Sequence, residues 1–333
     1  MVVAKSTLRR HQKGIGAEVR KIPRSVRIAL LQKLDCAFYL QSIGFSVFKW
    51  QQAVLNDKGK RKVILAARQS GKSTIVAGKI VHIARFEPGS LCIIGAPTEN
   101  QAAETMHKVL SFMRADPDYP ATRKCSIEEV ELENGSRIIV RTAKSDTFRG
   151  YSKPRVILLD EASRIEEEAY ISGARPMLTD NPDGELIIIS TPNGQQGFFY
   201  NAFFSTLGNW SKYLVRSPYQ PVLGNDGMYT LDEYTKDPKF WRQQQAEQNV
   251  HAYFSPRHKD YGFQLEQLSE MGRRQYQQEY CCDFVEAAGQ VFTYDEIAGM
   301  FRNWSEEEIH AKLPQIDAER LMDELRTVGG VAI

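Results

Sequence analysis

The sequence predicts an α/β fold, with a mostly parallel β-sheet, helices on both of its faces and a small helical subdomain after it. Two observations predict this class. Short apolar runs alternate with helical stretches from residue 63 onwards, the pattern of parallel strands joined by crossover helices. The chain has 333 residues, of which 42% are hydrophobic and 25% are charged. This is enough for one large α/β domain and a smaller appendage.

The predicted elements follow one another in a regular order. Residues 28–43 have the apolar spacing of a helix. Two alternating runs flank Asn134-Gly135, a strong turn signal, so an antiparallel hairpin is expected before the fourth main strand. From about Pro218 the β-branched runs disappear, and residues 231–285 are predicted to be helical. The main strands are expected at Val63–Ala67, Leu91–Gly95, Val156–Leu159 and Leu186–Ile189, and the helices after them at 72–86, 99–114 and 196–206.

Changes in charge and in amino-acid composition divide the chain into four predicted parts. Residues 1–35 form a basic arm, 36–220 the α/β domain, 221–290 a lid or linker subdomain and 291–333 an acidic extension. Residues 1–33 contain nine Lys or Arg against one Glu, and residues 295–324 contain nine Asp or Glu against three basic residues. The arm suits a polyanion such as DNA, and it equally suits a solvated tail.

Cysteine usage and hydropathy exclude several classes of protein. The five cysteines include no CxxC pair, which argues against a disulfide framework or a structural zinc site. No apolar run approaches the roughly 18 residues that span a bilayer, and the charged N-terminus lacks the apolar region of a secretory signal. We therefore expect a cytosolic location and no association with membranes.

A phosphate-binding loop is predicted at Lys62–Thr74, which reads KVILAARQSGKST. An apolar strand enters a loop, and Gly-Lys-Ser-Thr opens a helix, which is the Walker A arrangement with Ala66 in place of the first glycine. Backbone N–H groups and the helix N-terminus would face the phosphates, Lys72 would neutralise their oxygens, and Ser73 would ligate Mg²⁺. The predicted ATP-binding residues are Gln51, Ala67, Arg68, Gln69, Ser70, Gly71, Lys72, Ser73 and Thr74.

Two further strand ends have polar residues that suit phosphate chemistry. In VILLDEAS, Asp160 would hold Mg²⁺ through water and Glu161 would polarise the attacking water, the Walker B pattern. In LIIISTPNG, the Ser190-Thr191-Pro192 motif could bond the terminal phosphate or the water. A solvated acidic turn and an ordinary strand-end turn are the alternatives for the two motifs.

In this order, the motifs resemble those of the large terminase subunits of tailed phages. Arg68 lies inside the phosphate loop, and the resemblance covers about residues 45–292. It also rests on FKWQQAVL at Phe48–Leu55, APTENQA at Ala96–Ala102, TFRG at Thr147–Gly150, STP at Ser190–Pro192 and QEYCCDFVEAAGQVF at Gln278–Phe292.

The resemblance implies a P-loop NTPase fold of the ASCE/RecA-like kind, with ATP and Mg²⁺ bound. It implies a motor that hydrolyses ATP to drive double-stranded DNA into a procapsid through contacts with the phosphate backbone. The partners would be a capsid portal, a small terminase subunit and further copies in a ring, in the host cytoplasm. Gln51 would read the adenine, and Ser190, Thr191 and Pro192 would couple hydrolysis to movement. Arg68 in cis or Arg149 in trans would stabilise the transition state. For both arginines, the alternative is a surface ion pair.

Two other functions stay open at this stage. A helicase-like translocase fits the glutamine and Ser-Thr-Pro motifs, although the chain is short for a second RecA-like domain. A nucleotide-binding assembly module with little turnover is the other, and Glu161 argues against it because mere binding needs no water-positioning carboxylate. Family members usually continue into an RNase H-like nuclease with metal-binding acidic residues. The acidic residues within 291–333 do not lie on the apolar strands that such a site needs, and they are interpreted as a solvated extension. Nuclease activity is therefore not expected from this chain.

Overall fold

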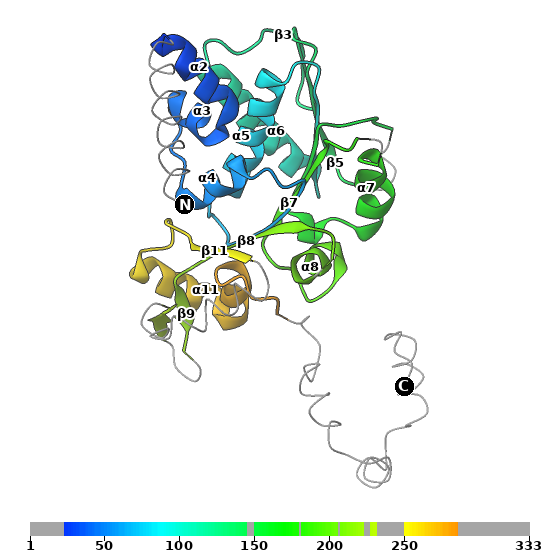
Figure 1. Cartoon of the computed structure of the whole chain (residues 1–333). Helices are drawn as coiled ribbons and strands as arrows, with labels where there is room; N and C mark the ends of the chain where they lie inside the picture. Colours follow the sequence, from blue (N-terminus) through cyan, green and yellow to red (C-terminus); the bar gives the residue numbers. More distant parts are fainter. Residues whose placement is uncertain are drawn as a thin grey trace, which may run out of the picture. The chain divides into compact units, whose positions relative to one another are not determined.

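A nine-stranded sheet forms the centre of the protein, in the order β11-β8-β1-β7-β6-β2-β5-β4-β3 (Figure 1). The computed structural model describes residues 23–144, 150–179, 181–205, 207–222, 227–231 and 250–285. The strands are β1 (Arg61–Ala66), β2 (Leu91–Ala96), β3 (Thr122–Cys125), β4 (Glu129–Leu132), β5 (Arg137–Thr142), β6 (Val156–Asp160), β7 (Glu185–Ser190), β8 (Trp210–Arg216) and β11 (Val250–Phe254). Every pairing from β11 to β5 is parallel, and the pairings of β4 with β5 and with β3 are antiparallel. The predicted parallel sheet and the predicted hairpin are therefore confirmed.

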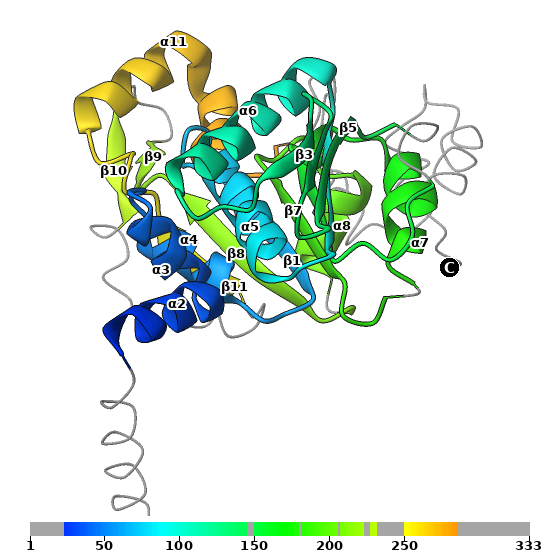
Figure 2. The same cartoon turned by 90° about the horizontal axis from the view of Figure 1, so that it is seen from above.

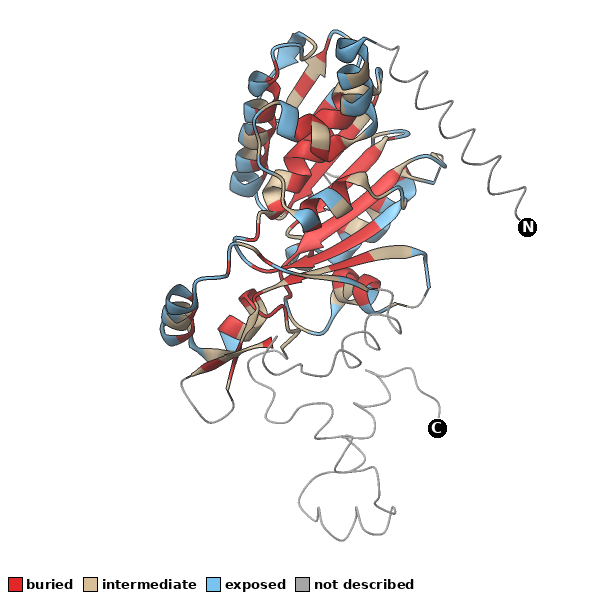
Figure 3. Ribbon diagram, turned by 60° about the vertical axis from the view of Figure 1, so that its left-hand side comes forward, coloured by how far each residue is buried: buried red, intermediate tan, exposed pale blue. Residues whose placement is uncertain are grey.

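Helices cover both faces because the strand side chains alternate between two buried cores (Figures 2 and 3). In β1, for example, Ile64 joins the first core, and Val63 and Leu65 join the second. The first core packs against α3 (Cys36–Ser42), α4 (Lys49–Asn56), α5 (Lys72–Phe86) and α6 (Glu99–Ala115); the second packs against η2 (Ala169–Ala174), α7 (Arg175–Met177) and α8 (Gly197–Phe204).

The helix predicted at 28–43 is two helices in the structure, and Asp35 is the reason. This residue has an extended backbone (φ −126°, ψ 103°) between α2 (Arg24–Leu34) and α3. Its carboxylate accepts a hydrogen bond of 2.8 Å from the Phe38 N–H, so it caps the start of α3. A residue that is compatible with helical spacing thus begins a new helix because its side chain satisfies free backbone donors.

The region after Pro218 differs from the predicted helical subdomain. Residues 250–254 form β11, which extends the main sheet next to β8, so the prediction of a helical subdomain over 231–285 is wrong there. The helix α11 (Tyr261–Glu279) is present, and β9 (Tyr219–Pro221) pairs with β10 (Met228–Thr230) in a separate two-stranded sheet. The half-exposed β11 sequence VHAYF lacks the continuous apolar run that marked the central strands.

A third, smaller core holds this region together. It contains Met228, Leu268, Tyr276, Tyr280 and Cys281, so α11 packs against the β9–β10 pair. No helix in the part of the chain that the structure describes is long and apolar enough to cross a membrane. The predicted domain boundaries at 35, 220 and 290 stay predictions, and the basic residues 1–22 and the acidic residues 291–333 lie outside the described residues.

Candidate active site

The phosphate loop lies between the end of β1 and the start of α5, where the sequence predicts it. Gly71 has a φ of 103°, a left-handed conformation that glycine adopts without steric cost. A Cβ at this position would also come within 2.8 Å of Nε2 of Gln51. Glycine is thus required at position 71 both for the turn into α5 and for the close approach of the Gln51 side chain.

Lys72 is buried at the first position of α5 and is held by its own loop. Its Nζ donates to the carbonyl oxygens of Ala66 (3.3 Å) and Ala67 (3.4 Å), and it lies 3.5 Å from Oε1 of Glu161. These are weak contacts for a lysine that is only 8% exposed. An anionic ligand in the pocket would give the ammonium group shorter, charge-assisted partners.

The acidic pair, Asp160 and Glu161, lies at the carboxyl end of β6, two strands away from β1 in the sheet. Burial, and then the negative charge of Glu161, raise the pKa of Asp160 to about 6. Glu161 has a left-handed backbone (φ 49°), which is uncommon for a residue with a Cβ and is found disproportionately at functional sites. Backbone strain at this position therefore agrees with a catalytic role for the Glu161 side chain.

Ser190 connects the end of β7 to the acidic pair. Its hydroxyl donates to Oε2 of Glu161 (3.2 Å) and lies 2.8 Å from the hydroxyl of Ser163, which belongs to η1 (Ala162–Arg164). Both Ser190 and Thr191 are buried. Of the Ser-Thr-Pro motif, then, it is Ser190 that contacts Glu161.

Gln51 is buried on α4, and both the oxygen and the nitrogen of its side-chain amide form hydrogen bonds within the protein. Its Oε1 accepts from the Phe48 N–H (2.9 Å), and its Nε2 donates to the carbonyl oxygen of Gly71 (3.1 Å). The glutamine thus ties the start of α4 to the phosphate loop. Its predicted contact with adenine stays a prediction.

A pocket of about 310 Å³ brings Gly71, Lys72 and Glu161 together, while Gln51, Asp160 and Ser190 lie outside its wall. Two residues in its wall were missed by the sequence analysis: Lys108 on α6 and Arg257 in the turn after β11. Lys108 follows an ordinary amphipathic pattern and Arg257 belongs to no motif, so the sequence held no signal for either. The wall consists of Arg68, Gln69, Gly71, Lys72, Ser73, Thr74, Lys108, Glu161 and Arg257.

The charge of the pocket suits a polyphosphate. Arg68, Lys72, Lys108 and Arg257 face a single carboxylate, that of Glu161, among the lining residues. Arg68 is exposed, and its backbone N–H donates to the carbonyl oxygen of Glu279 (2.7 Å) in α11. The other predicted arginine, Arg149, lies outside the described residues.

The donors at this end of the sheet also fit magnesium. The described residues contain no cluster of three or more His, Cys, Asp or Glu that could hold a metal ion by themselves. Mg²⁺ takes one or two carboxylates together with phosphate oxygens and water, so Asp160 and Ser73 would suffice as its protein ligands if a nucleotide were present. The donor set therefore requires no further protein ligand.

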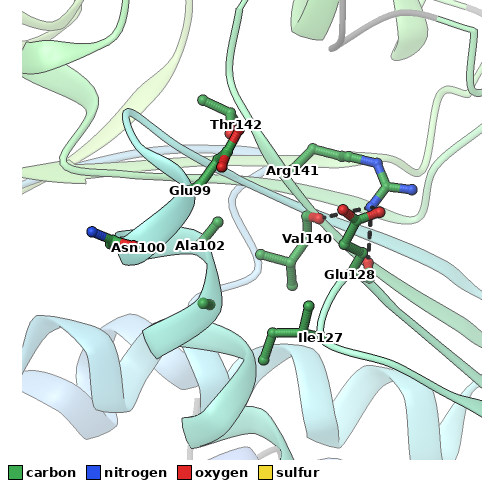
Figure 4. A pocket seen from close by; sticks show the side chains of 9 residues that line it. Glu99, Asn100, Ala102, Ile127, Glu128, Val140, Arg141 and Thr142 are labelled. Atoms are coloured by element: carbon green, nitrogen blue, oxygen red, sulfur yellow. Dashed lines mark hydrogen bonds and ion pairs between the residues drawn. The ribbon is translucent and has the colours of Figure 1, made fainter.

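A larger hollow of about 590 Å³ lies between α6 and the hairpin strands, and it shares no residue with the phosphate pocket (Figure 4). Arg141 in its wall pairs with Glu128 at 2.8 Å, while Val140, Ala102 and Ile127 provide an apolar side. Its charged groups are engaged with each other or open to solvent. We therefore place the candidate active site at the smaller pocket, where cations and a strained acidic residue converge.

A parallel sheet with a phosphate loop after one strand and an acidic pair at the end of another defines the P-loop NTPase fold. Residues 63–298 match the family model described as "Terminase large subunit, T4likevirus-type, N-terminal", and the chain belongs to this family. Two curated relatives, the large terminase subunits of Thermus virus P23-45 and Thermus phage G20c, are 30% identical to it in an alignment 186 residues long that covers 48% of this chain. The matched region covers 37% of the length of each relative.

Solved structures share the fold at lower sequence identity. The ATPase domain of the Thermus phage P74-26 large terminase is 22% identical with a TM-score of 0.54, and the match covers 74% of this chain and 97% of that one. The large terminase of bacteriophage HK97 is 15% identical with a TM-score of 0.54, covering 78% of this chain and 55% of that one. These likenesses bear out the predicted α/β fold.

Proposed function

We propose that this chain is the ATP-hydrolysing motor portion of a viral DNA-packaging terminase. The observation that supports this most is that Lys72 and Glu161 line one pocket 3.5 Å apart, and that Ser190 from a third element donates to Glu161. Family membership makes the same chemistry the expected one. The substrate is ATP with Mg²⁺, and the products are ADP and inorganic phosphate.

Each residue has a task in the proposed hydrolysis. Glu161 accepts a hydrogen bond from the attacking water and directs it at the terminal phosphorus, while the Ser190 hydroxyl keeps the Glu161 carboxylate in place. As the new P–O bond forms, the bond to the bridging oxygen breaks, and Lys72 neutralises the charge that develops on the phosphate oxygens. Asp160 and Ser73 would hold Mg²⁺, which would supply further charge neutralisation when bound.

The arginines complete the proposed site. Arg68, exposed in the loop and in the pocket wall, is suited to reach a phosphate in cis. Arg149 is the candidate to act in trans on the nucleotide of a neighbouring copy. The nucleotide-binding residues are those predicted from the sequence, with Gln51 at the adenine and Ser190, Thr191 and Pro192 as the coupling segment.

The proposed cargo is double-stranded DNA, contacted through its phosphates without regard to sequence. The assembly would include the capsid portal, the small terminase subunit and a ring of copies of this chain, docked on the procapsid in the host cytoplasm. Residues 1–33, with nine basic residues against one acidic residue, supply charge of the right sign for DNA.

Steady-state hydrolysis of ATP with and without DNA tests this function. The wild-type chain should hydrolyse ATP, double-stranded DNA should change its rate, and added salt should remove the DNA effect. Glu161→Gln should lower kcat by about 10² to 10⁴, the usual contribution of a positioned general base, while ATP still binds. Turnover by Glu161→Gln at the wild-type rate would contradict the assignment of the catalytic carboxylate.

The same assay separates the two alternative functions. A nucleotide-binding assembly module would bind ATP and show no turnover that depends on Glu161. A helicase-like translocase would be stimulated by single-stranded DNA more than by duplex, whereas a packaging motor should prefer the duplex.

A further inference from the structure

The turn that follows β11 places an arginine at the phosphate pocket, far from the loop in sequence. Strand β11 pairs with β8 up to the contact of Phe254 with Arg216, and the Ser255 N–H donates to the carbonyl oxygen of Arg216 (2.8 Å). The His258 N–H then donates to the carbonyl oxygen of Ser255 (3.1 Å), which closes a tight turn. Arg257 lies inside this turn, so the main sheet determines its position.

Buried neighbours hold both ends of the turn. Ser255 is 0% exposed and His258 is 1% exposed. The His258 ring packs edge-on against Tyr280, with ring centroids 5.1 Å apart, and it lies against the backbone of Arg68 in the phosphate loop. Burial lowers the pKa of His258 to about 4, so the ring stays neutral at pH 7 and adds no charge to the pocket. The exposed Arg257 side chain is the part of this turn that faces the loop.

The guanidinium of Arg257 lies directly across the phosphate loop. Its Nη1 is 3.5 Å from the carbonyl oxygen of Gln69, and its Cζ is 4.0 Å from the point that a Cβ on Gly71 would occupy. Its Cζ also lies 5.6 Å from the centre of the Phe48 ring. Gln69 and Gly71 belong to the loop whose N–H groups face the phosphates in this fold.

These contacts leave most of the hydrogen-bonding capacity of Arg257 unused. One hydrogen bond at 3.5 Å is at the weak limit, and a guanidinium has five N–H donors. Within the described residues no carboxylate forms an ion pair with Arg257. A planar donor that has no anionic partner among the described residues, in a pocket wall with three other cations, is suited to bind phosphate oxygens in a bidentate manner.

We propose that Arg257 binds the phosphate groups of the nucleotide, so that the turn after β11 closes one side of the nucleotide pocket. The inference rests on the proposed ATPase function and adds a ligand that no sequence motif contains. A bound nucleotide would thereby connect the phosphate loop to the edge of the sheet and, through His258 and Tyr280, to α11. The Arg257 side chain needs to break only the long contact with Gln69 to make this connection.

The affinity for ADP, measured by calorimetry with Mg²⁺ on the full chain, tests the proposal. Arg257→Gln keeps the aliphatic stem as far as Cδ and a neutral donor but removes the guanidinium with its charge, and it should weaken ADP binding about tenfold, the loss of one charge-assisted hydrogen bond. Arg257→Glu should weaken it further, because like charges repel. Arg274→Gln is the matched control, since it removes an exposed arginine from α11 outside the pocket wall, and it should bind ADP like the wild type.

Competition by inorganic pyrophosphate separates phosphate binding from contact with the base. If Arg257 binds phosphate, Arg257→Gln weakens pyrophosphate and ADP by the same factor. A loss for ADP with unchanged pyrophosphate affinity would overturn the proposal and assign Arg257 to the base side of the pocket, beside Phe48. Unchanged ADP affinity in both Arg257→Gln and Arg257→Glu would overturn it as well.

A failure of the proposed function gives a different result. In that case the wild-type chain does not bind ADP, or Lys72→Ala binds it as the wild type does. If ADP binding depends on Lys72 but not on Arg257, the proposed function stands and only the present inference is lost. Urea unfolding without nucleotide shows that the Arg257 variants are folded, and it should give midpoints close to that of the wild type because their side-chain contacts in the protein are weak.

Discussion

At the scale of single residues, burial decides the charge state of the titratable groups. Asp160 and His82 are both buried, and their pKa values move in opposite directions, to about 6 and about 4 respectively. The cause is the same, because burial disfavours the charged form of either group. Asp160 lies at the end of β6, next to Glu161 of the pocket wall. His82 lies in the first core, between Tyr39 and Phe86, and has no role there that requires a charge.

The depressed pKa of His82 predicts a loss of stability in acid. Its folded pKa of about 4 lies below the usual histidine pKa of 6.5, so the stability it contributes is present above pH 6.5 and is lost as the pH falls towards 4. The full loss is on the order of 3 kcal/mol. His82→Gln, which can still donate to the Gln32 carbonyl oxygen, should lose less stability between pH 7 and pH 4.5 in urea unfolding.

The matched control for this experiment is His107→Gln, on the exposed side of α6. It should leave the pH dependence of the wild type unchanged. An equal pH dependence in wild type and His82→Gln would show that other groups cause the acid instability.

At the scale of elements, a buried ion network joins two strands and a helix away from the active site. Glu185 at the start of β7 accepts from Lys62 of β1 (3.0 Å), pairs with Lys79 of α5 (3.6 Å) and pairs with Arg155 before β6 (2.9 Å). Burial alone would raise the pKa of Glu185, but Lys79, Lys62 and Arg155 hold it below its usual value. One carboxylate therefore compensates two buried lysines, which would be costly to leave unpaired.

Glu185→Gln should lower the free energy of unfolding by about 3 to 5 kcal/mol, because it leaves Lys62 and Lys79 buried without an opposite charge. Urea unfolding at pH 7 measures this. The control is Glu128→Gln, whose ion pair with Arg141 is largely exposed and should contribute about 0 to 1 kcal/mol. Similar losses in the two variants would mean that the Glu185 network is no stronger than a surface pair.

At the scale of the whole molecule, the segment after residue 218 is built into the ATPase fold. β11 extends the main sheet, the Arg68 N–H of the phosphate loop donates to Glu279 at the end of α11, and the Ser217 N–H donates to the Tyr280 carbonyl oxygen. Side chains add to this, because Glu279 pairs with Arg164 beside the acidic pair (3.6 Å). A change in the loop therefore reaches α11 through direct contacts.

A chain that ends at Gln220 tests the domain boundary predicted there. Without β11, strand β8 would become an exposed edge of the sheet, and the Arg68 N–H would lose its partner. We expect this shortened chain to unfold at lower urea concentration than the full chain, to bind ADP more weakly and to aggregate. A soluble fragment that binds ADP like the full chain would contradict this and would support a boundary at 220.

Much of the fold could be predicted because its signals are local. The strands Val63–Ala67, Leu91–Gly95, Val156–Leu159 and Leu186–Ile189 are central and covered on both faces, so their sequences are continuously apolar and match β1, β2, β6 and β7 within one or two residues. The edge strand β11 is half exposed and has no such run. Its place depends on pairing with β8, which local patterning does not encode.

By itself, the sequence determined the α/β class, the phosphate loop, the acidic pair and the likeness to large terminases. These follow from contiguous residues, because a strand, a glycine-containing turn and a helix N-terminus are adjacent in the chain. Only the tertiary structure decided which distant groups meet: Ser190 with Glu161, Gln51 with Gly71, and Arg257 with the phosphate loop. The order of strands in the sheet sets the contacts of Ser190 and Arg257, because parallel pairing brings strand ends together whatever their separation in sequence. The packing of α4 against α5 sets the contact of Gln51 with Gly71.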